Sequence, residues 1–168
     1  MRAIETFNRL DIRYLQRNNL LRPGRSFPLS WTRGGVEAGE IWVDVAWGYL
    51  VLSYWVTIGG ESENVDEEIA LDFTECTYGG ERPWFLCPGC DRRVGILALA
   101  EKYFRCRHCY DLKYTSQFET DQDRASSKFW KLWDRLGEGK PKGMHWRTYE
   151  RLLHKLAEAD KRATELLI

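Results

Sequence analysis

Two closely spaced cysteine pairs constrain the fold of this chain more than any other feature. Cys87 and Cys90 form one C-x-x-C pair, Cys106 and Cys109 form another, and fifteen residues separate the pairs. A C-x-x-C turn presents two thiolates to one ion, and structural zinc sites are closed by four such ligands in a tetrahedron. The separation fits a short β-hairpin that runs out over 93–99 and back over 102–105. The sequence therefore predicts one structural zinc ion bound by Cys87, Cys90, Cys106 and Cys109.

Other chemistries for these cysteines stay open. A C-P-G-C motif can be redox-active in a βαβ setting with a single pair, and four thiolates also permit an iron–sulfur cluster. His108 lies between two of the ligands and could replace one of them. The fifth cysteine, Cys76, occurs in a strand pattern, and we expect a buried thiol there. Because four protein thiolates leave no position for water, we expect a structural metal and no catalytic role for it.

Composition places the chain among globular proteins with reduced thiols. Its 168 residues are 43% hydrophobic and include eight Trp, eight Tyr and seven Phe. No stretch approaches the ~18 consecutive apolar residues of a membrane span, and the first residues lack the apolar region of a signal peptide. An odd number of cysteines also argues against a disulfide framework. We therefore expect a cytoplasmic protein.

The formal net charge of zero hides a strong division along the chain. Residues 1–33 contain seven Arg and two acids, whereas residues 34–81 contain eleven acids and no Lys or Arg. Residues 82–168 contain eighteen basic residues and twelve acids. Segregation of this kind can create one face that attracts a polyanion and another that repels it.

The pattern of apolar residues predicts an α+β fold. A short helix is expected over 11–21, with Asp11 as its N-cap and Pro23 after its end. Alternating apolar residues separated by Gly-rich turns then predict an antiparallel β-meander, with strands near 26–32, 40–46, 49–58 and 69–74. Because the run 49–58 is apolar throughout, we expect a central strand that is covered on both faces.

Two amphipathic patterns follow the cysteines and predict a C-terminal antiparallel helical hairpin joined by residues 137–143. The expected apolar faces contain Ala125, Phe129, Leu132, Trp133 and Leu136 in the first helix, and Tyr149, Leu152, Leu153, Leu156, Ala163, Leu166 and Leu167 in the second. The predicted organisation is an N-terminal helix with an acidic antiparallel sheet over 1–82, a four-Cys zinc ribbon continuing that sheet over 83–117, and a basic helical hairpin over 118–168.

Basic residues recur beside the apolar face of both predicted helices. Such a stripe can contact the phosphates of nucleic acid, although a solvated helix face is the common alternative. We predict a non-enzymatic protein that binds nucleic acid, DNA in particular, as an accessory or regulatory factor. The expected contact residues are Arg124, Lys128, Lys131, Arg135, Lys140, Lys142, Arg147 and Arg151, and Lys155 extends the same pattern.

The acidic segment supports an alternative function. Its carboxylates, or the Trp-rich surface, could make the chain a protein-interaction adaptor or an inhibitor in conflict between phages or mobile elements and their hosts. Glu67, Glu68 and Asp72 are the residues whose neutralisation would test this interpretation. An ordinary solvated sheet face is the simpler explanation of the same charges.

A nuclease is a third possibility, with a metal held by Glu119, Asp121 and Asp123. Acids at the start of a helix are also favoured by the helix dipole, so their presence alone is weak evidence for catalysis. The sequence contains no Ser-His-Asp set and no Gly-rich phosphate loop, and we expect no enzymatic activity. Neither the partner nor the oligomeric state can be read from it.

Several motifs resemble those of a known family. They are Trp84-Phe-Leu-Cys-Pro-Gly-Cys-Asp-Arg-Arg-Val94, Phe104-Arg-Cys-Arg-His-Cys-Tyr-Asp-Leu112 and Pro141-Lys-Gly-Met-His-Trp-Arg-Thr-Tyr-Glu150. They resemble a family of small bacterial zinc-ribbon proteins that often accompany mobile elements, and segments 10–13 and 21–27 extend the likeness to most of the chain. The family usually has Gly where this chain has Asp91, which leaves the ligands unchanged. The resemblance implies a bacterial cytosolic zinc protein and implies no particular activity.

Overall fold

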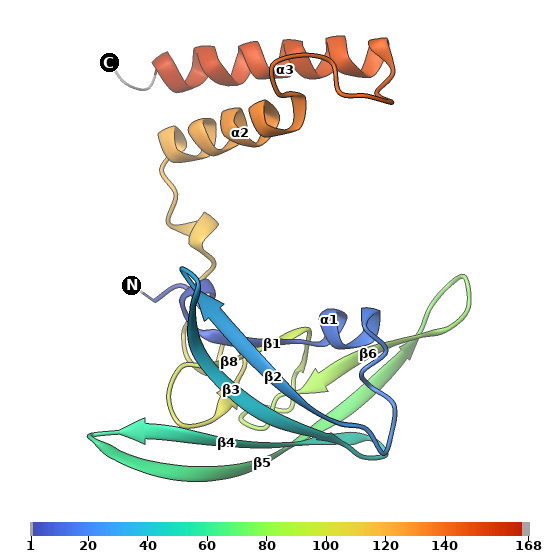
Figure 1. The fold of residues 1–168 in the computed structure, drawn as a ribbon, viewed down its shortest axis with the longest axis vertical. Coiled ribbons are helices and arrows are strands. Elements are labelled where there is room, and N and C mark those ends of the chain that lie inside the picture. The colour runs from blue at the N-terminus through green and yellow to red at the C-terminus, as the bar shows by residue number, and fades with distance from the viewer. Residues whose placement is uncertain (1, 166–168) are drawn as a thin grey trace. The chain divides into compact units, whose positions relative to one another are not determined.

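A computed structural model describes residues 2–165 and separates the chain into two compact units, Met1–Tyr114 and Thr115–Ile168 (Figure 1). Unit 1 contains the strands and the short helix α1, whereas unit 2 contains helices α2 and α3. The predicted α+β fold is confirmed, with antiparallel sheets, a cluster of four cysteines and a C-terminal helical pair. Unit 1 contains both the acidic sheet and the segment with the four clustered cysteines, 87–109. Leu166 and Leu167, expected on an apolar face, lie outside the described residues.

The larger sheet of unit 1 is a six-stranded antiparallel meander in which every strand pairs with the next along the chain. Gly59 and Gly60, with φ of 62° and 91°, form one of its turns, in a region of φ that other residues rarely adopt. Its strands are β2 (Ser26–Arg33), β3 (Val36–Val45), β4 (Tyr49–Ile58), β5 (Glu61–Glu75), β6 (Glu81–Leu86) and β7 (Arg93–Val94).

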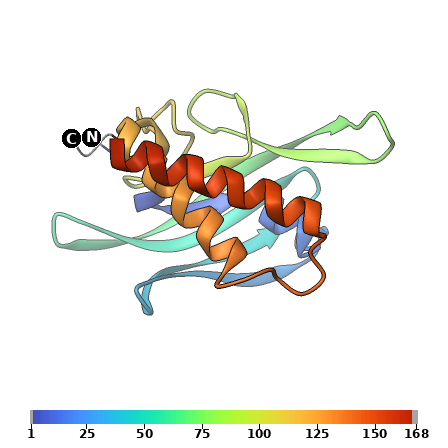
Figure 2. The ribbon, with the colours of Figure 1, turned by 90° about the horizontal axis from the view of Figure 1, so that it is seen from above.

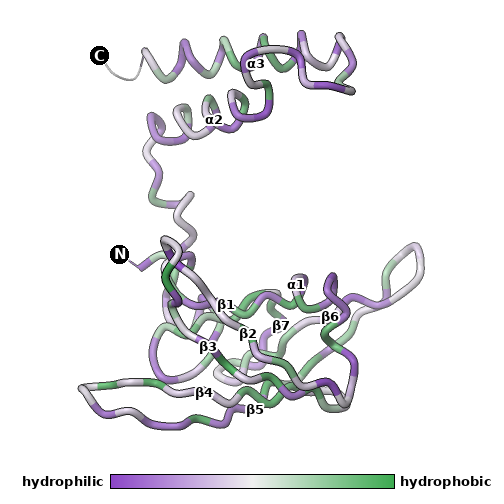
Figure 3. Tube along the Cα trace, in the orientation of Figure 1, coloured by the Kyte–Doolittle hydropathy of each residue, from purple (hydrophilic) through white to green (hydrophobic). Residues whose placement is uncertain are grey.

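Strand β4 occupies the predicted residues, but the expectation that it is covered on both faces is wrong. Leu50, Leu52 and Tyr54 are buried, whereas Trp55, whose side chain points to the opposite face, is 71% exposed. The apolar composition of this run did not predict its burial correctly, because the core lies against only one face of the sheet. Strand β5 is much longer than predicted, since its alternation continues through a polar first half, which Figure 3 shows as mostly hydrophilic.

The smaller sheet has the order β1-β8-β9, with β1 (Asn8–Asp11), β8 (Ile96–Leu99) and β9 (Phe104–Arg105). Pairing of Ala98 with Arg105 and of Leu99 with Phe104 forms the hairpin expected between the cysteine pairs. After β6, the predicted zinc-ribbon segment (83–117) continues the large sheet only through β7, because Gly95 separates β7 from β8. The carbonyl oxygen of Gly95 accepts a hydrogen bond from Ile12 N (3.0 Å). The predicted outgoing strand is therefore divided between two sheets.

A single large core connects the two sheets with α1 (Ile12–Arg17). As predicted, Asp11 caps this helix, accepting a hydrogen bond from Arg13 N at 2.9 Å. The helix ends four residues earlier than expected, because Asn19 has a φ of 53° and Leu20 N donates to Leu15 O (2.9 Å), which closes its C-terminus. Fully buried core side chains include Leu10, Leu15, Val43, Leu52, Ile69, Phe85, Leu97 and Phe104.

In unit 2, α2 (Asp121–Leu136) and α3 (Trp146–Glu165) pack side by side (Figures 1 and 2). Hydrophilic and hydrophobic residues alternate along both helices (Figure 3). The N-cap residue Thr120 forms a reciprocal capping box with Asp123. The contact between the helices is small, and its buried residues are Ala125, Leu136, Leu152 and Ala159. Over residues 2–165, no helix combines the length and apolar character needed to cross a membrane.

Candidate functional site

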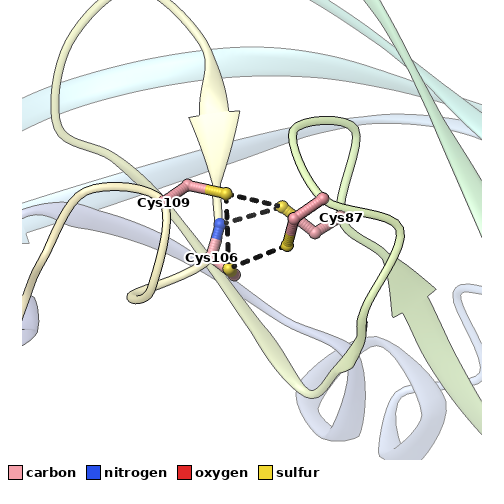
Figure 4. A group of neighbouring side chains, drawn as sticks. Cys87, Cys106 and Cys109 are labelled. Carbon is pink, nitrogen blue, oxygen red and sulfur yellow. Dashed lines mark hydrogen bonds between the residues drawn. The ribbon is translucent and has the colours of Figure 1, made fainter.

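The four cysteines predicted as ligands meet at one point in unit 1. Cys87 and Cys90 follow β6, whereas Cys106 and Cys109 follow β9. Figure 4 shows how Cys87, Cys106 and Cys109 lie close together. Their sulfurs lie within 4.8 Å of one another, with separations of 3.7 Å for Cys87–Cys109, 3.6 Å for Cys90–Cys106 and 3.7 Å for Cys106–Cys109. Ligands about 2.3 Å from a tetrahedral ion are about 3.8 Å apart. The cluster can therefore hold one metal ion.

The same backbone turn presents both pairs. Cys90 N donates to Cys87 O and Cys109 N donates to Cys106 O, each at 3.1 Å. Cys106 N also donates to Cys87 Sγ (3.3 Å), which links the second turn to the first. N–H groups directed at sulfur favour the thiolate form that a metal requires.

Glycine is favoured inside the first turn for a steric reason. A Cβ atom at Gly89 would lie 2.8 Å from Arg105 Cδ and 3.0 Å from Cys109 Sγ. Asp91, just after the turn, has a φ of 54°, in the left-handed region that favours glycine. A glycine at position 91 would adopt this backbone conformation with less strain than Asp91 does.

The two sides of the cluster differ in exposure. Cys87 and Cys106 are buried, whereas Cys90 and Cys109 are exposed. Burial raises the pKa of the Cys106 thiol, while a hydrogen bond from the backbone of Arg92 lowers the pKa of Cys90 to about 7. Bound metal would favour the thiolate at every position, so binding is coupled to proton release.

His108 and Cys76, two residues near the cluster in the sequence, do not take part in it. His108 is exposed and does not belong to the four-residue cluster. Cys76 is exposed, so the prediction of a buried thiol is wrong. Strand β5 ends at Glu75, and Cys76 N donates to Gly80 O in the turn that follows, which removes Cys76 from the strand pattern.

A buried carboxylate lies beside the cysteine cluster, and its burial was not predicted from the sequence. Glu67 of β5 is 7% exposed; its Oε2 accepts hydrogen bonds from Tyr54 Oη (2.9 Å) and from Phe104 N (2.8 Å). It also forms an ion pair with Arg105, and this contact raises the pKa of Arg105 although burial opposes the shift. Glu67 thus holds β9 immediately before Cys106. The sequence position of Glu67 could have indicated its burial, because it lies two residues from Val65 and from Ile69, whose side chains point into the core.

Two more acids of the sheet pair with the cysteine segment. Asp72 forms an ion pair with Arg93, and Glu63 accepts from Lys102 Nζ at 2.7 Å. The hydrogen bond from Arg93 lowers the pKa of Asp72. Of the three acids chosen to test a docking surface, Glu67 and Asp72 therefore form internal ion pairs, and Glu68 stays exposed.

Part of the predicted basic stripe lines a groove between α2 and α3, with a volume of about 450 Å³. Arg124 and Lys128 also line a neighbouring cavity of about 380 Å³, to which Arg162 contributes. Arg162 was not predicted, although it lies seven residues after Lys155 on the same helical face. The basic residues of the larger groove are Arg124, Lys128, Lys131, Arg135 and Lys155.

The other predicted contact residues do not line this groove. Lys140 donates to Met144 O (2.7 Å), and its ammonium lies 5.4 Å from the centre of the Trp146 ring. Lys142, Arg147 and Arg151 are exposed.

The acids proposed for a nuclease site do not converge. Asp123 belongs to the capping box, and Asp121 pairs with Arg124 at 3.2 Å. In the described part of the chain, the cysteine cluster is the one group of three or more potential ligands close enough to hold a metal. No protein-family model, curated protein or solved structure matches the chain. The resemblance to bacterial zinc-ribbon proteins therefore stays a prediction.

Proposed function

We propose that this protein binds nucleic acid, DNA in particular, as a non-enzymatic accessory factor, and that its helical pair supplies the contact surface. The observation that supports this most directly is the groove where four cations of α2 face Lys155 of α3. Cations held around one concavity attract phosphates more strongly than cations spread over a solvated face, because their fields add.

The surroundings of the groove favour the same interpretation. Glu119 is the single acid among its lining residues, and Leu132 and Leu152 supply its apolar part. Arg124 is partly neutralised by Asp121, but this pair is exposed and therefore weak. Lys128, Lys131 and Arg135 form no ion pair within residues 2–165, so their charges are available to a polyanion.

We further propose that the cysteine cluster holds zinc in a structural role. The sulfur separations suit a tetrahedral ion, and four thiolates would occupy all of its positions. Cys87, Cys90, Cys106 and Cys109 would then cross-link two turns, and the energy of metal binding would become folding energy of unit 1. Elemental analysis should find one zinc per chain and no iron, and the protein should be colourless; a brown protein containing iron and sulfide would contradict zinc.

The test of the main proposal is a salt titration of DNA binding by the full chain. We expect the affinity to fall steeply with salt, and the double variant Lys128→Glu, Lys131→Glu to lower the slope by about one per lost phosphate contact. Lys161→Glu is the control, because Lys161 also belongs to the helical pair, on α3, but it pairs with Glu165 and does not line the groove. No binding to DNA or RNA at low salt, or an equal loss in the control, would refute the proposal.

A second candidate function, docking of a basic protein partner, is favoured by the outer face of the large sheet. Asp44 pairs across the strands with Val51, and Val51 with Glu68. On the same face Trp42 and Trp55 are 46% and 71% exposed. Acids beside exposed Trp rings suit a cationic protein, for instance in a conflict between a mobile element and its host. A pull-down should then lose its partner in the variant Glu68→Lys and keep it in Lys128→Glu, Lys131→Glu.

A further inference from the structure

A concave pocket of about 580 Å³ lies in unit 1 between the N-terminal segment, α1 and β2. This volume falls within the range of small-molecule sites, roughly 300–1,000 Å³. The pocket is rich in arginine, with four guanidinium groups and two carboxylates among its lining residues. The arginines are Arg9, Arg13, Arg17 and Arg33.

One of the four arginines is neutralised inside the protein. Both oxygens of Asp11 accept hydrogen bonds from Arg13, at 3.1 Å to Nε and 2.9 Å to Nη2. The remaining three form no ion pair with a carboxylate anywhere in the described chain. Their side-chain hydrogen bonds go to neutral oxygens, from Arg17 Nε to Arg13 O (3.2 Å) and from Arg33 Nη2 to Asn8 Oδ1 (3.0 Å). Four arginines against Glu5 and Asp11 leave the lining with a formal charge of +2, which favours an anionic ligand.

The wall of the pocket is held in place by hydrogen bonds. Trp31 Nε1 donates to Arg9 O at 2.9 Å, which ties β2 to β1. Asn8 Nδ2 donates to Ala38 O at 3.0 Å, so the amide that receives Arg33 is itself anchored on β3. Guanidinium groups placed in advance lose less entropy when they bind a phosphate, and their planar fork matches its oxygens.

Five of the other lining residues are apolar and partly aromatic, whereas Asn8, Ser30 and Thr32 are polar and neutral. Tyr14 is 49% exposed, so part of its side chain is accessible to a ligand, and Trp31 is half-buried. Aromatic side chains bind nucleobases by stacking, and this contact depends little on the identity of the base. The apolar residues are Phe7, Tyr14, Leu29, Trp31 and Ile96.

We infer that this pocket binds a nucleotide, with its phosphate on Arg9, Arg17 and Arg33 and its base against Tyr14 and Trp31. The ligand chemistry can come from a free mononucleotide or from one nucleotide of a strand. The pocket belongs to unit 1, so the inference does not depend on the groove between α2 and α3.

Calorimetric titration of the full chain at low salt tests the inference, with thymidine, thymidine 5′-monophosphate and a short oligothymidylate as probes. The oligothymidylate is titrated into the double variant Lys128→Glu, Lys131→Glu, so that the helical groove does not mask the pocket. We expect the monophosphate or the oligothymidylate to bind and thymidine not to bind. Arg17→Glu and Arg33→Glu should each weaken binding by about tenfold or more.

Arg22→Glu is the matched control, because Arg22 is also exposed and in unit 1 but does not line the pocket. Circular dichroism would report whether the charge reversals disturb the fold. If they do, Arg17→Gln and Arg33→Gln test the same contacts with a smaller change of charge. Binding of the monophosphate itself identifies a free nucleotide as a sufficient ligand, whereas binding of the oligothymidylate alone identifies a strand. The inference is overturned if neither phosphate probe binds, if thymidine binds equally well, or if Arg22→Glu causes the same loss.

Discussion

Unit 1 is stabilised by contacts between segments far apart in the chain, and unit 2 by contacts between neighbours. In unit 1, Glu67 of β5 holds Phe104 and Arg105 of β9, and the cysteine cluster joins the turns that follow β6 and β9. In unit 2, two consecutive helices share a small apolar contact and a local capping box. Unit 1 therefore combines a buried core with polar and thiolate contacts between distant segments, whereas unit 2 depends on packing between two consecutive helices.

The largest expected effect is loss of the cysteine cluster. Cys106→Ser should unfold much of unit 1, since apparent binding energies of structural zinc are about 10–16 kcal/mol and contribute to folding. Because unit 2 is stabilised locally, its helical signal should persist in circular dichroism while backbone amides of unit 1 lose protection from exchange. Cys76→Ser is the control, and as an exposed thiol outside the cluster it should change neither measurement. Intact strands after metal removal would show that the cluster is dispensable.

The buried carboxylate should rank second. Glu67→Ala leaves Arg105 and Phe104 N without their partner, and breaking such a buried pair costs about 3 kcal/mol. Chemical denaturation followed at unit 1 amides would measure this loss. The adjacent Glu68→Ala removes an exposed carboxylate and should change stability by less than about 0.5 kcal/mol. Equal effects of the two variants would mean that the Glu67 contacts contribute nothing.

A smaller and strictly local effect is expected in unit 2. Thr120→Ala removes the N-cap of α2 and should destabilise that helix by about 1 kcal/mol. Amide exchange should rise in unit 2 and stay unchanged in unit 1. Thr164→Ala removes a hydroxyl that bonds back to Asp160 O within α3, and should be neutral or slightly stabilising. A rise in exchange that extends to unit 1 would show that the units are not independent.

The smallest expected effect has the opposite sign. Asp91→Gly relieves a φ of 54° just after the first cysteine turn and should stabilise unit 1 by about 0.5 kcal/mol. Asp66→Gly, within the regular part of β5, should instead be destabilising, because Gly weakens a strand interior. Thermal unfolding of the metal-loaded protein would separate the two, and a loss of stability in Asp91→Gly would contradict the strain.

The parts of the fold that could be predicted were those encoded in short patterns. The C-x-x-C spacing predicted that Cys87 and Cys106 belong to one cluster, and an apolar run bounded by glycines located β4 at its observed residues. The predictions failed where burial depends on a distant partner. Trp55 is exposed because its side chain lies on the face of the sheet away from the core of unit 1, and Cys76 is exposed in the turn after β5. No local pattern reports either fact.

The candidate sites also contain some features that the sequence predicted and others that it did not. Periodicity alone indicated the cations of α2, because residues three or four positions apart share a helix face. Their convergence with Lys155 on one groove required the packing of α2 against α3. The arginine pocket, which is lined by Arg9 of β1, Arg17 of α1 and Arg33 of β2, could not be read from the sequence at all.

The sequence by itself determined the α+β class, the meander, the four clustered cysteines and the helical pair, since each follows from the geometry of a turn, a strand or a helix. The tertiary structure decided that the cysteine ribbon divides between two sheets, that Glu67 is buried, and that basic residues surround two separate concavities. The physical reason is that hydrogen bonding within an element depends on near neighbours, whereas burial and the summed field of charges depend on which distant segments pack together.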